Sequence, residues 1–131
     1  MLVGVSRTSK TPVSIFLAYR GWQVANVPLI VDLEPPPALF RVDRARVIAL
    51  TITPERLVLL RKARANRMGH PLSSHYAGIE HVQQELDWAE LLIRRGRWAV
   101  VDVTNKSIEE CAAEIIALQR KRVRAQRKAQ K

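Results

Sequence analysis

The sequence predicts an α/β fold with a mostly parallel sheet and helices on both of its faces. Short apolar runs alternate with longer segments of helical period, and Gly, Pro or helix-capping residues stand between them. Parallel strands need long crossover connections, usually helices, which cover both faces of the sheet. The 131 residues give room for one domain with a core of its own.

Four segments are predicted strands and four are predicted helices. The strands span residues 2–4, 23–30, 46–52 and 98–103. The helices span residues 11–20, 54–67, 76–95 and 108 onward. Thr53 and Pro54 are the N-cap and first residue of the second helix, and Ser107 with Glu110 makes a capping box for the last. A loop is predicted at 69–74. Because the first strand opens the chain, we expect a truncated domain.

The net charge of +10 is concentrated at the C-terminal end. Seven of the 22 basic residues lie in 120–131, where there is no acid, so the rest holds 15 basic against 12 acidic residues. We therefore predict a domain of residues 1–119 and a basic tail, helical or disordered, of residues 120–131. The nearly balanced body argues against nucleic-acid binding. Apolar runs are too short to span a membrane, and the single Cys111, predicted to be a packing residue, suits a cytoplasmic protein.

Residues 4–11, GVSRTSKT, join the first strand to the first helix with the spacing of a P-loop NTPase Walker A motif. Gly4 supplies the turn, Lys10 reaches the terminal phosphates, and Thr11 ligates Mg²⁺ at the positive end of the helix dipole. Arg7 can stabilise a transferring phosphoryl group. Ser9, however, stands where the motif has a second glycine, which permits positive φ. An ordinary strand–turn–helix link with capping hydroxyls is the alternative.

Other charged residues are weaker candidates. Asp102 follows the fourth strand and is the candidate base or metal-orienting carboxylate, with local capping of backbone N–H groups as an equal alternative. Asp32 is a weaker carboxylate candidate. A basic stretch on the second helix could contact phosphate or a protein substrate, but it is interpreted as a solvated face: Arg61, Lys62, Arg64 and Arg67. The histidines His70, His75 and His81 are interpreted as surface residues.

The stretches GVSRTSKTPVSIFLAYRGWQVANVPLIVDLEPPPALF, RVIALTITPERLVLLRKAR and VVDVTNKSIEECAAEII resemble the pyruvate, phosphate dikinase regulatory proteins. The resemblance extends to about Leu118. A sister branch acting on phosphoenolpyruvate synthase typically reads SRCGKT and ANYPF where this chain has SRTSKT and ANVPL. Family members phosphorylate an active-site threonine of the dikinase with ADP and reverse this by phosphorolysis, which yields pyrophosphate. Their N-terminal half has no counterpart here.

The resemblance implies an ADP-dependent protein kinase and phosphate-dependent phosphorylase with the dikinase as protein substrate. Its ligands are ADP and phosphate, with Mg²⁺ at Thr11, and the candidate catalytic residues are Arg7, Lys10 and Asp102. The implied ADP site comprises Gly4, Val5, Ser6, Arg7, Thr8, Ser9, Lys10 and Thr11. Three alternatives stay open: a regulator of phosphoenolpyruvate synthase, an ATP-dependent small-molecule P-loop kinase, and a non-catalytic nucleic-acid binder using the tail. A homodimer is also left open.

Overall fold

The structure, a computed structural model, describes residues 1–67 and 78–129. Its centre is a four-stranded sheet in the order β2-β1-β3-β4, and every pairing in it is parallel. The strands are β1 (Leu2–Gly4), β2 (Asn26–Pro28), β3 (Ile48–Thr51) and β4 (Ala99–Asp102). The predicted α/β class and parallel sheet are confirmed.

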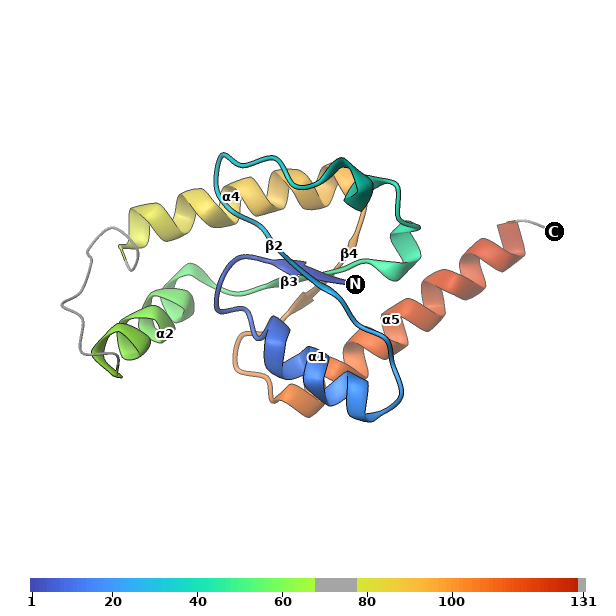
Figure 1. Cartoon of the computed structure of the whole chain (residues 1–131), viewed down its shortest axis with the longest axis horizontal. Coiled ribbons are helices and arrows are strands. Elements are labelled where there is room, and N and C mark those ends of the chain that lie inside the picture. Colours follow the sequence, from blue (N-terminus) through green and yellow to red (C-terminus); the bar gives the residue numbers. More distant parts are fainter. Residues whose placement is uncertain (68–77, 130–131) are drawn as a thin grey trace.

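Helices lie on both faces of this sheet and beyond one of its ends (Figure 1). They are α1 (Lys10–Tyr19), α2 (Pro54–Arg67), α4 (Ile79–Gly96) and α5 (Ile108–Ala129), with short 3₁₀ turns η1 (Pro37–Phe40) and η2 (Arg44–Arg46). α1 and α5 pack together on one face, and α4 lies on the other. α2 stands beyond the carboxyl ends of the strands and packs against α4.

The strands are shorter than the apolar runs predict. β2 has three of the eight residues of 23–30, because it is an edge strand that pairs only with the three-residue β1. β3 begins at Ile48 rather than residue 46, because the Asp43 carboxylate accepts a hydrogen bond from the Ala45 N–H (3.1 Å) and caps η2. The predicted loop 69–74, with His70 and His75, lies outside the described residues.

α5 carries the chain from the body of the fold into the basic C-terminal segment. The Ser107 hydroxyl accepts a hydrogen bond from the Glu110 N–H (3.1 Å), so the predicted N-cap is confirmed. Without a break the helix then runs to residue 129. Two polar contacts tie this far part to the body: Arg122 Nη1 donates to the Arg97 carbonyl (2.7 Å), and Gln126 Nε2 donates to Asp43 Oδ1 (2.6 Å).

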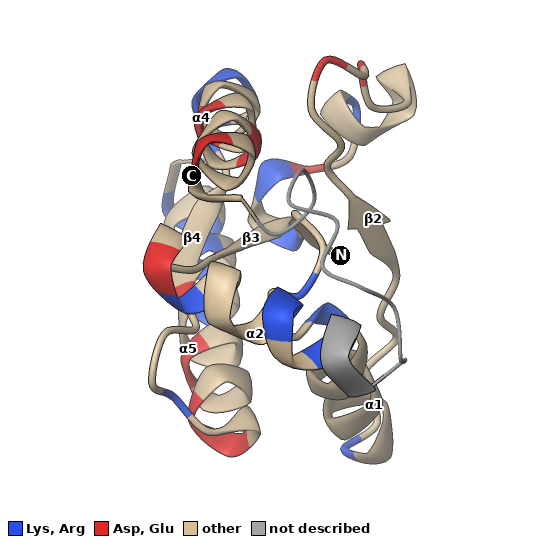
Figure 2. Ribbon diagram, turned by 90° about the vertical axis from the view of Figure 1, so that its left-hand side faces the viewer, with Lys and Arg blue, Asp and Glu red and all other residues tan. Residues whose placement is uncertain are grey.

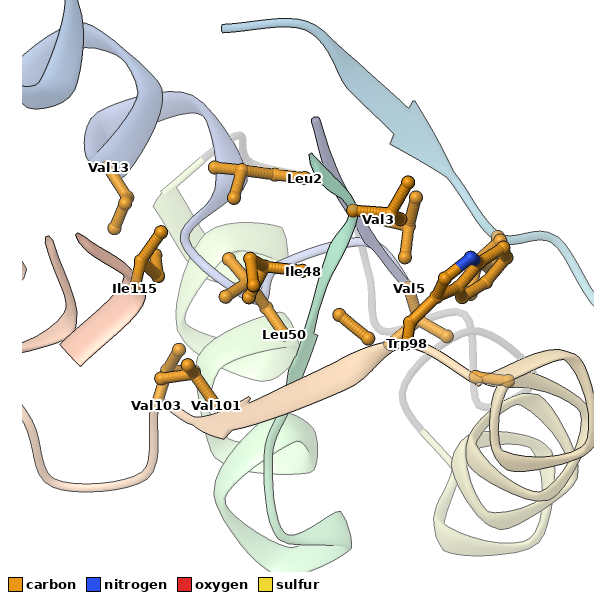
Figure 3. Close-up of a cluster of buried hydrophobic side chains, with 14 of the residues drawn as sticks. Leu2, Val3, Val5, Val13, Ile48, Leu50, Trp98, Val101, Val103 and Ile115 are labelled. Carbon is orange, nitrogen blue, oxygen red and sulfur yellow. The ribbon is translucent and has the colours of Figure 1, made fainter. Parts of the chain in front are cut away.

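The core lies on both faces of the sheet and meets the helices that cover it (Figure 3). Val13 of α1 and Ile115 of α5 lie on one side, and Trp98 stacks on Phe40 on the other with ring centroids 5.4 Å apart. Cys111 is buried here as a free thiol, which confirms its packing role. Each large apolar side chain so buried stabilises the fold by about 1.5–3 kcal/mol. Among the described helices, none is both long and apolar enough to cross a membrane.

Candidate functional site

The segment of residues 4–11 leaves the carboxyl end of β1 and enters the N-terminus of α1. β1 is an interior strand, with β2 on one side and β3 on the other. In open parallel sheets, ligands bind beyond the carboxyl ends of the strands, where loops from neighbouring strands meet. The sheet topology therefore places this loop where an α/β protein usually holds its ligand.

Gly4 is required by close packing rather than by a turn. It is the last residue of β1, and the positive φ angles of the loop lie elsewhere. A Cβ added at Gly4 would lie 2.8 Å from both the Leu50 carbonyl oxygen and the Thr8 hydroxyl oxygen. The expectation that Gly4 supplies the turn is thus wrong, because its missing side chain instead lets the loop close onto β3.

Two other residues make the turn of the loop. Arg7 and Ser9 have φ angles of 70° and 64°, both left-handed, and they flank the fully buried Thr8. Thr8 Oγ1 donates to the Val5 carbonyl (2.8 Å) and fixes the bend from inside. Left-handed residues in such a turn direct successive backbone N–H groups toward one side, which makes an anion-binding concavity. Ser9 therefore adopts the positive φ that the glycine of the Walker motif provides, at a cost of about 1–2 kcal/mol.

The N-terminus of α1 faces the same concavity. Ser9 is its N-cap, but the Ser9 side chain makes no capping hydrogen bond, and the first turn of α1 has no acidic residue. The ordinary-link alternative therefore lacks the capping hydrogen bond that it expects at Ser9. The first N–H groups of a helix need acceptors, and the helix dipole favours an anion as that acceptor.

Lys10, the first residue of α1, folds back over the loop. Its Nζ donates to the Val5 carbonyl (2.6 Å) and lies 3.4 Å from Thr8 Oγ1. Burial, and secondarily the positive charge of Arg61, lower the pKa of Lys10 from 10.5 to about 8. The loop thus holds a partly desolvated ammonium group with neutral oxygens as its partners, and a bound anion would relieve this cost.

Beside the loop lies a cavity of about 450 Å³, bounded on its far side by α2. The described residues of its lining include three cationic side chains and no carboxylate: Ser6, Arg7, Ser9, Lys10, Thr11, Pro12, Leu60 and Arg64. A cavity of this size and charge fits a ligand with several negative charges better than a single carboxylate.

The structure places the two candidate carboxylates apart from this cavity. Asp102 ends β4, which is separated from β1 by β3, and its Oδ1 accepts a hydrogen bond from the Thr104 N–H (2.8 Å). Asp32 lies in a turn after β2 with a φ of 61°. Neither is among the described residues that line the cavity.

The interpretation of the α2 basic stretch as a solvated face is wrong for Arg61, which is fully buried. Its guanidinium forms an ion pair with Glu85 of α4, and its Nη2 lies 3.4 Å from the Ser6 carbonyl oxygen. His81, expected at the surface, is half-buried with its Nε2 3.6 Å from Glu85 Oε1. The helical spacing of α2 could have indicated that Arg61 is buried. Arg61 lies one turn after the buried Leu57 and is therefore on the same face of the helix.

Comparison with known proteins identifies the family of this chain. The family model described as kinase/pyrophosphorylase matches residues 1–116. The chain belongs to the kinase/pyrophosphorylase family. All eight residues of the loop and all four strands lie within the matched range.

Relatives in this family carry the name pyruvate, phosphate dikinase regulatory protein. One from Geobacter sulfurreducens is 50% identical over 117 residues, which are 88% of this chain and 44% of the relative. Another from Bdellovibrio bacteriovorus is 43% identical over 90% of this chain and 42% of its own length. A chloroplastic relative from Oryza sativa subsp. indica is 47% identical over 90% of this chain and 26% of its own. The chain thus spans less than half the length of these relatives.

Proposed function

We propose that this chain is the nucleotide-binding part of a regulator of pyruvate, phosphate dikinase. The regulator transfers the β-phosphoryl group of ADP to a dikinase threonine and removes it again by phosphorolysis. The observation that carries the proposal is the loop of residues 4–11. One cavity is faced by its left-handed residues Arg7 and Ser9, by Lys10 and by the uncapped start of α1. The family description and the names of the relatives support the reaction class and the protein substrate.

In the forward reaction, the threonine hydroxyl oxygen attacks the β-phosphorus of ADP. The bond from that phosphorus to the bridging oxygen breaks, AMP leaves, and the hydroxyl proton passes to a base. In the reverse reaction, an oxygen of inorganic phosphate attacks the phosphorus of the phosphothreonine. Pyrophosphate forms, and the threonine oxygen regains a proton. Both steps move charge onto phosphate oxygens, so positioned cations and N–H groups accelerate them.

The loop residues have separate roles in this proposal. The backbone N–H groups around Ser9 and the start of α1 hold the diphosphate of ADP. Lys10 leaves the Val5 carbonyl for the terminal phosphate, and Arg7, exposed at the rim, neutralises the transferring phosphoryl group. Asp102 is the proposed base; it does not line the described part of the cavity, so this role requires the dikinase threonine to approach from the carboxyl end of β4.

A magnesium ion would be held by the Thr11 hydroxyl and by phosphate oxygens. Within the described ranges, no three His, Cys, Asp or Glu side chains converge to hold a metal. Thr11 lines the cavity, and Mg²⁺ in nucleotide sites takes most of its ligands from phosphates and water, so this sparse donor set fits it. The ion would neutralise phosphate charge there.

The reaction is proposed to take place in the cytoplasm, as the single buried cysteine suits a reducing compartment.

The test measures transfer of label from the β-phosphate of ADP to purified dikinase, with ATP in a parallel reaction. Lys10→Ala should reduce ADP-dependent labelling about 100-fold or more, because it removes a phosphate-binding cation. Lys62→Ala, which removes an exposed cation of α2 outside the cavity, is the matched control and should retain activity. Equal activity of the two variants, or labelling with the ATP γ-phosphate instead, would contradict the proposal.

A further inference from the structure

α2 carries two arginines, Arg61 and Arg64, close to the loop and its cavity. They are three residues apart, so they share one face of the helix. Arg61 is buried behind the loop, whereas Arg64 is exposed and lines the cavity with Leu60. Figure 2, which views the molecule from the side where α2 lies, shows basic residues on α2 next to the start of α1.

The buried arginine links three segments that are distant in sequence. Its guanidinium pairs with Glu85 on α4 and lies 3.4 Å from the Ser6 carbonyl oxygen, directly before the left-handed Arg7. The second oxygen of Glu85 lies 3.6 Å from His81 Nε2, so the carboxylate is engaged on both sides. A desolvated ion pair of this kind fixes geometry well, because moving either partner leaves a buried charge without its counter-charge.

We propose that α2 is the second wall of the loop's phosphate site. Arg64 binds a phosphate group held by the loop, and Arg61 is a positioning residue that sets the spacing between α2 and the loop. The cavity lining supports this, because among its described residues Arg7, Lys10 and Arg64 supply three cations and there is no carboxylate, which matches the charge of a diphosphate. A guanidinium binds phosphate in a bidentate fashion that a lysine does not reproduce. The inference rests on the proposed function and adds residues of α2 to that site.

The first test measures pyrophosphate affinity by calorimetry at low ionic strength. Arg64→Met should weaken binding about tenfold, because it removes a charge-assisted bidentate contact. Lys62→Met removes the same charge from an exposed position of the same helix outside the cavity, and its affinity should stay within about twofold. If both variants weaken binding equally, only the net charge of α2 matters and the assignment of Arg64 is wrong.

The second test separates positioning from stability. Arg61→Met with Glu85→Leu replaces the ion pair by apolar side chains of similar size, a change that is often neutral for stability. We expect cooperative unfolding near the wild-type temperature and a pyrophosphate affinity reduced about tenfold. Wild-type affinity in this folded variant would overturn the positioning role. If the variant does not unfold cooperatively, Arg61→Lys is measured instead. Lysine keeps the charge but lacks the two separate nitrogens with which Arg61 contacts Glu85 and the Ser6 carbonyl. Reduced affinity supports the positioning role, and wild-type affinity refutes it.

Ligand binding by the wild-type protein shows whether the proposed function fails or only the role given to α2. If it binds neither pyrophosphate nor ADP, the proposed function fails, and the inference fails with it. If it binds both and Arg64→Met binds them equally well, the loop site stands and only the contribution of α2 is refuted.

Discussion

Replacing Ser9 by glycine should stabilise the protein while preserving its ligand affinity. Ser9 has a φ of 64°, and a non-glycine residue in this left-handed conformation costs about 1–2 kcal/mol. Glycine removes that cost. Its greater conformational freedom in the unfolded chain, however, offsets about 0.5–1 kcal/mol of the gain in stability. Ser9 makes no side-chain capping hydrogen bond to lose. The expected net gain is therefore about 0.5–1 kcal/mol in the free energy of unfolding, or an increase of about 2–4 °C in Tm.

The assay is thermal and urea unfolding of Ser9→Gly beside Ser14→Gly. Ser14 lies inside α1, where its hydroxyl donates to the Thr11 carbonyl (2.8 Å) and accepts from Asn26 Nδ2 (3.2 Å). Glycine there should destabilise the protein by about 0.5–1 kcal/mol, because it loosens the helix interior. The two variants thus move stability in opposite directions. A Ser9→Gly variant less stable than the wild type, or one that no longer binds ADP, would refute the account of the loop's conformation.

Three further predictions concern the loop and its support. Gly4→Ala should destabilise the protein by about 1–3 kcal/mol in urea unfolding, because its Cβ would lie 2.8 Å from the Leu50 carbonyl oxygen; wild-type stability would show that this contact relaxes freely. ADP affinity should fall as pH rises through about 8, because the lowered pKa of Lys10 lets the free protein lose that proton, and calorimetry on Lys10→Met should show no such decline. Arg61→Met alone should cost about 3–5 kcal/mol of stability by removing the guanidinium partner of the buried Glu85 carboxylate; a smaller loss would mean that His81 or water compensates for the lost charge.

The same pKa shift predicts how stability depends on pH in the absence of ligand. The folded protein holds the Lys10 proton less tightly than the unfolded chain, with a pKa of about 8 against 10.5. Between these values the unfolded state binds more protons, so the contribution of Lys10 to stability increases as pH rises and is lost again as pH falls through about 8.

The alternation of strands and helices could be predicted because local chemistry sets it. Thr53 with Pro54 and Ser107 with Glu110 mark helix starts that the structure reproduces within a residue. Strand lengths could not be predicted, because an edge strand such as β2 is limited by its partner β1 and not by its own apolar run. The strand order β2-β1-β3-β4 depends on long-range packing, which a local pattern does not encode.

The features of the site that depend on local sequence could also be predicted, whereas those that depend on contacts with distant segments could not. The position of the loop could be predicted from its spacing, because the motif requires a strand before it and a helix that begins at its lysine and threonine, here Lys10 and Thr11. The role of Gly4 could not, because it depends on the Leu50 carbonyl of another strand. Arg61 was misjudged for a similar reason: within a run of basic residues it resembles solvated charge, and only the packing of α2 on α4 brings it to Glu85.

The most direct measurement of the central claim is a titration of the isotope-labelled protein with ADP, followed by amide chemical shifts. The account predicts saturable changes concentrated at the backbone amides of residues 6–11, with smaller changes around Arg64 and little change in the basic segment 120–129. Changes confined to residues 120–129, or none at concentrations that saturate an ordinary nucleotide site, would contradict it.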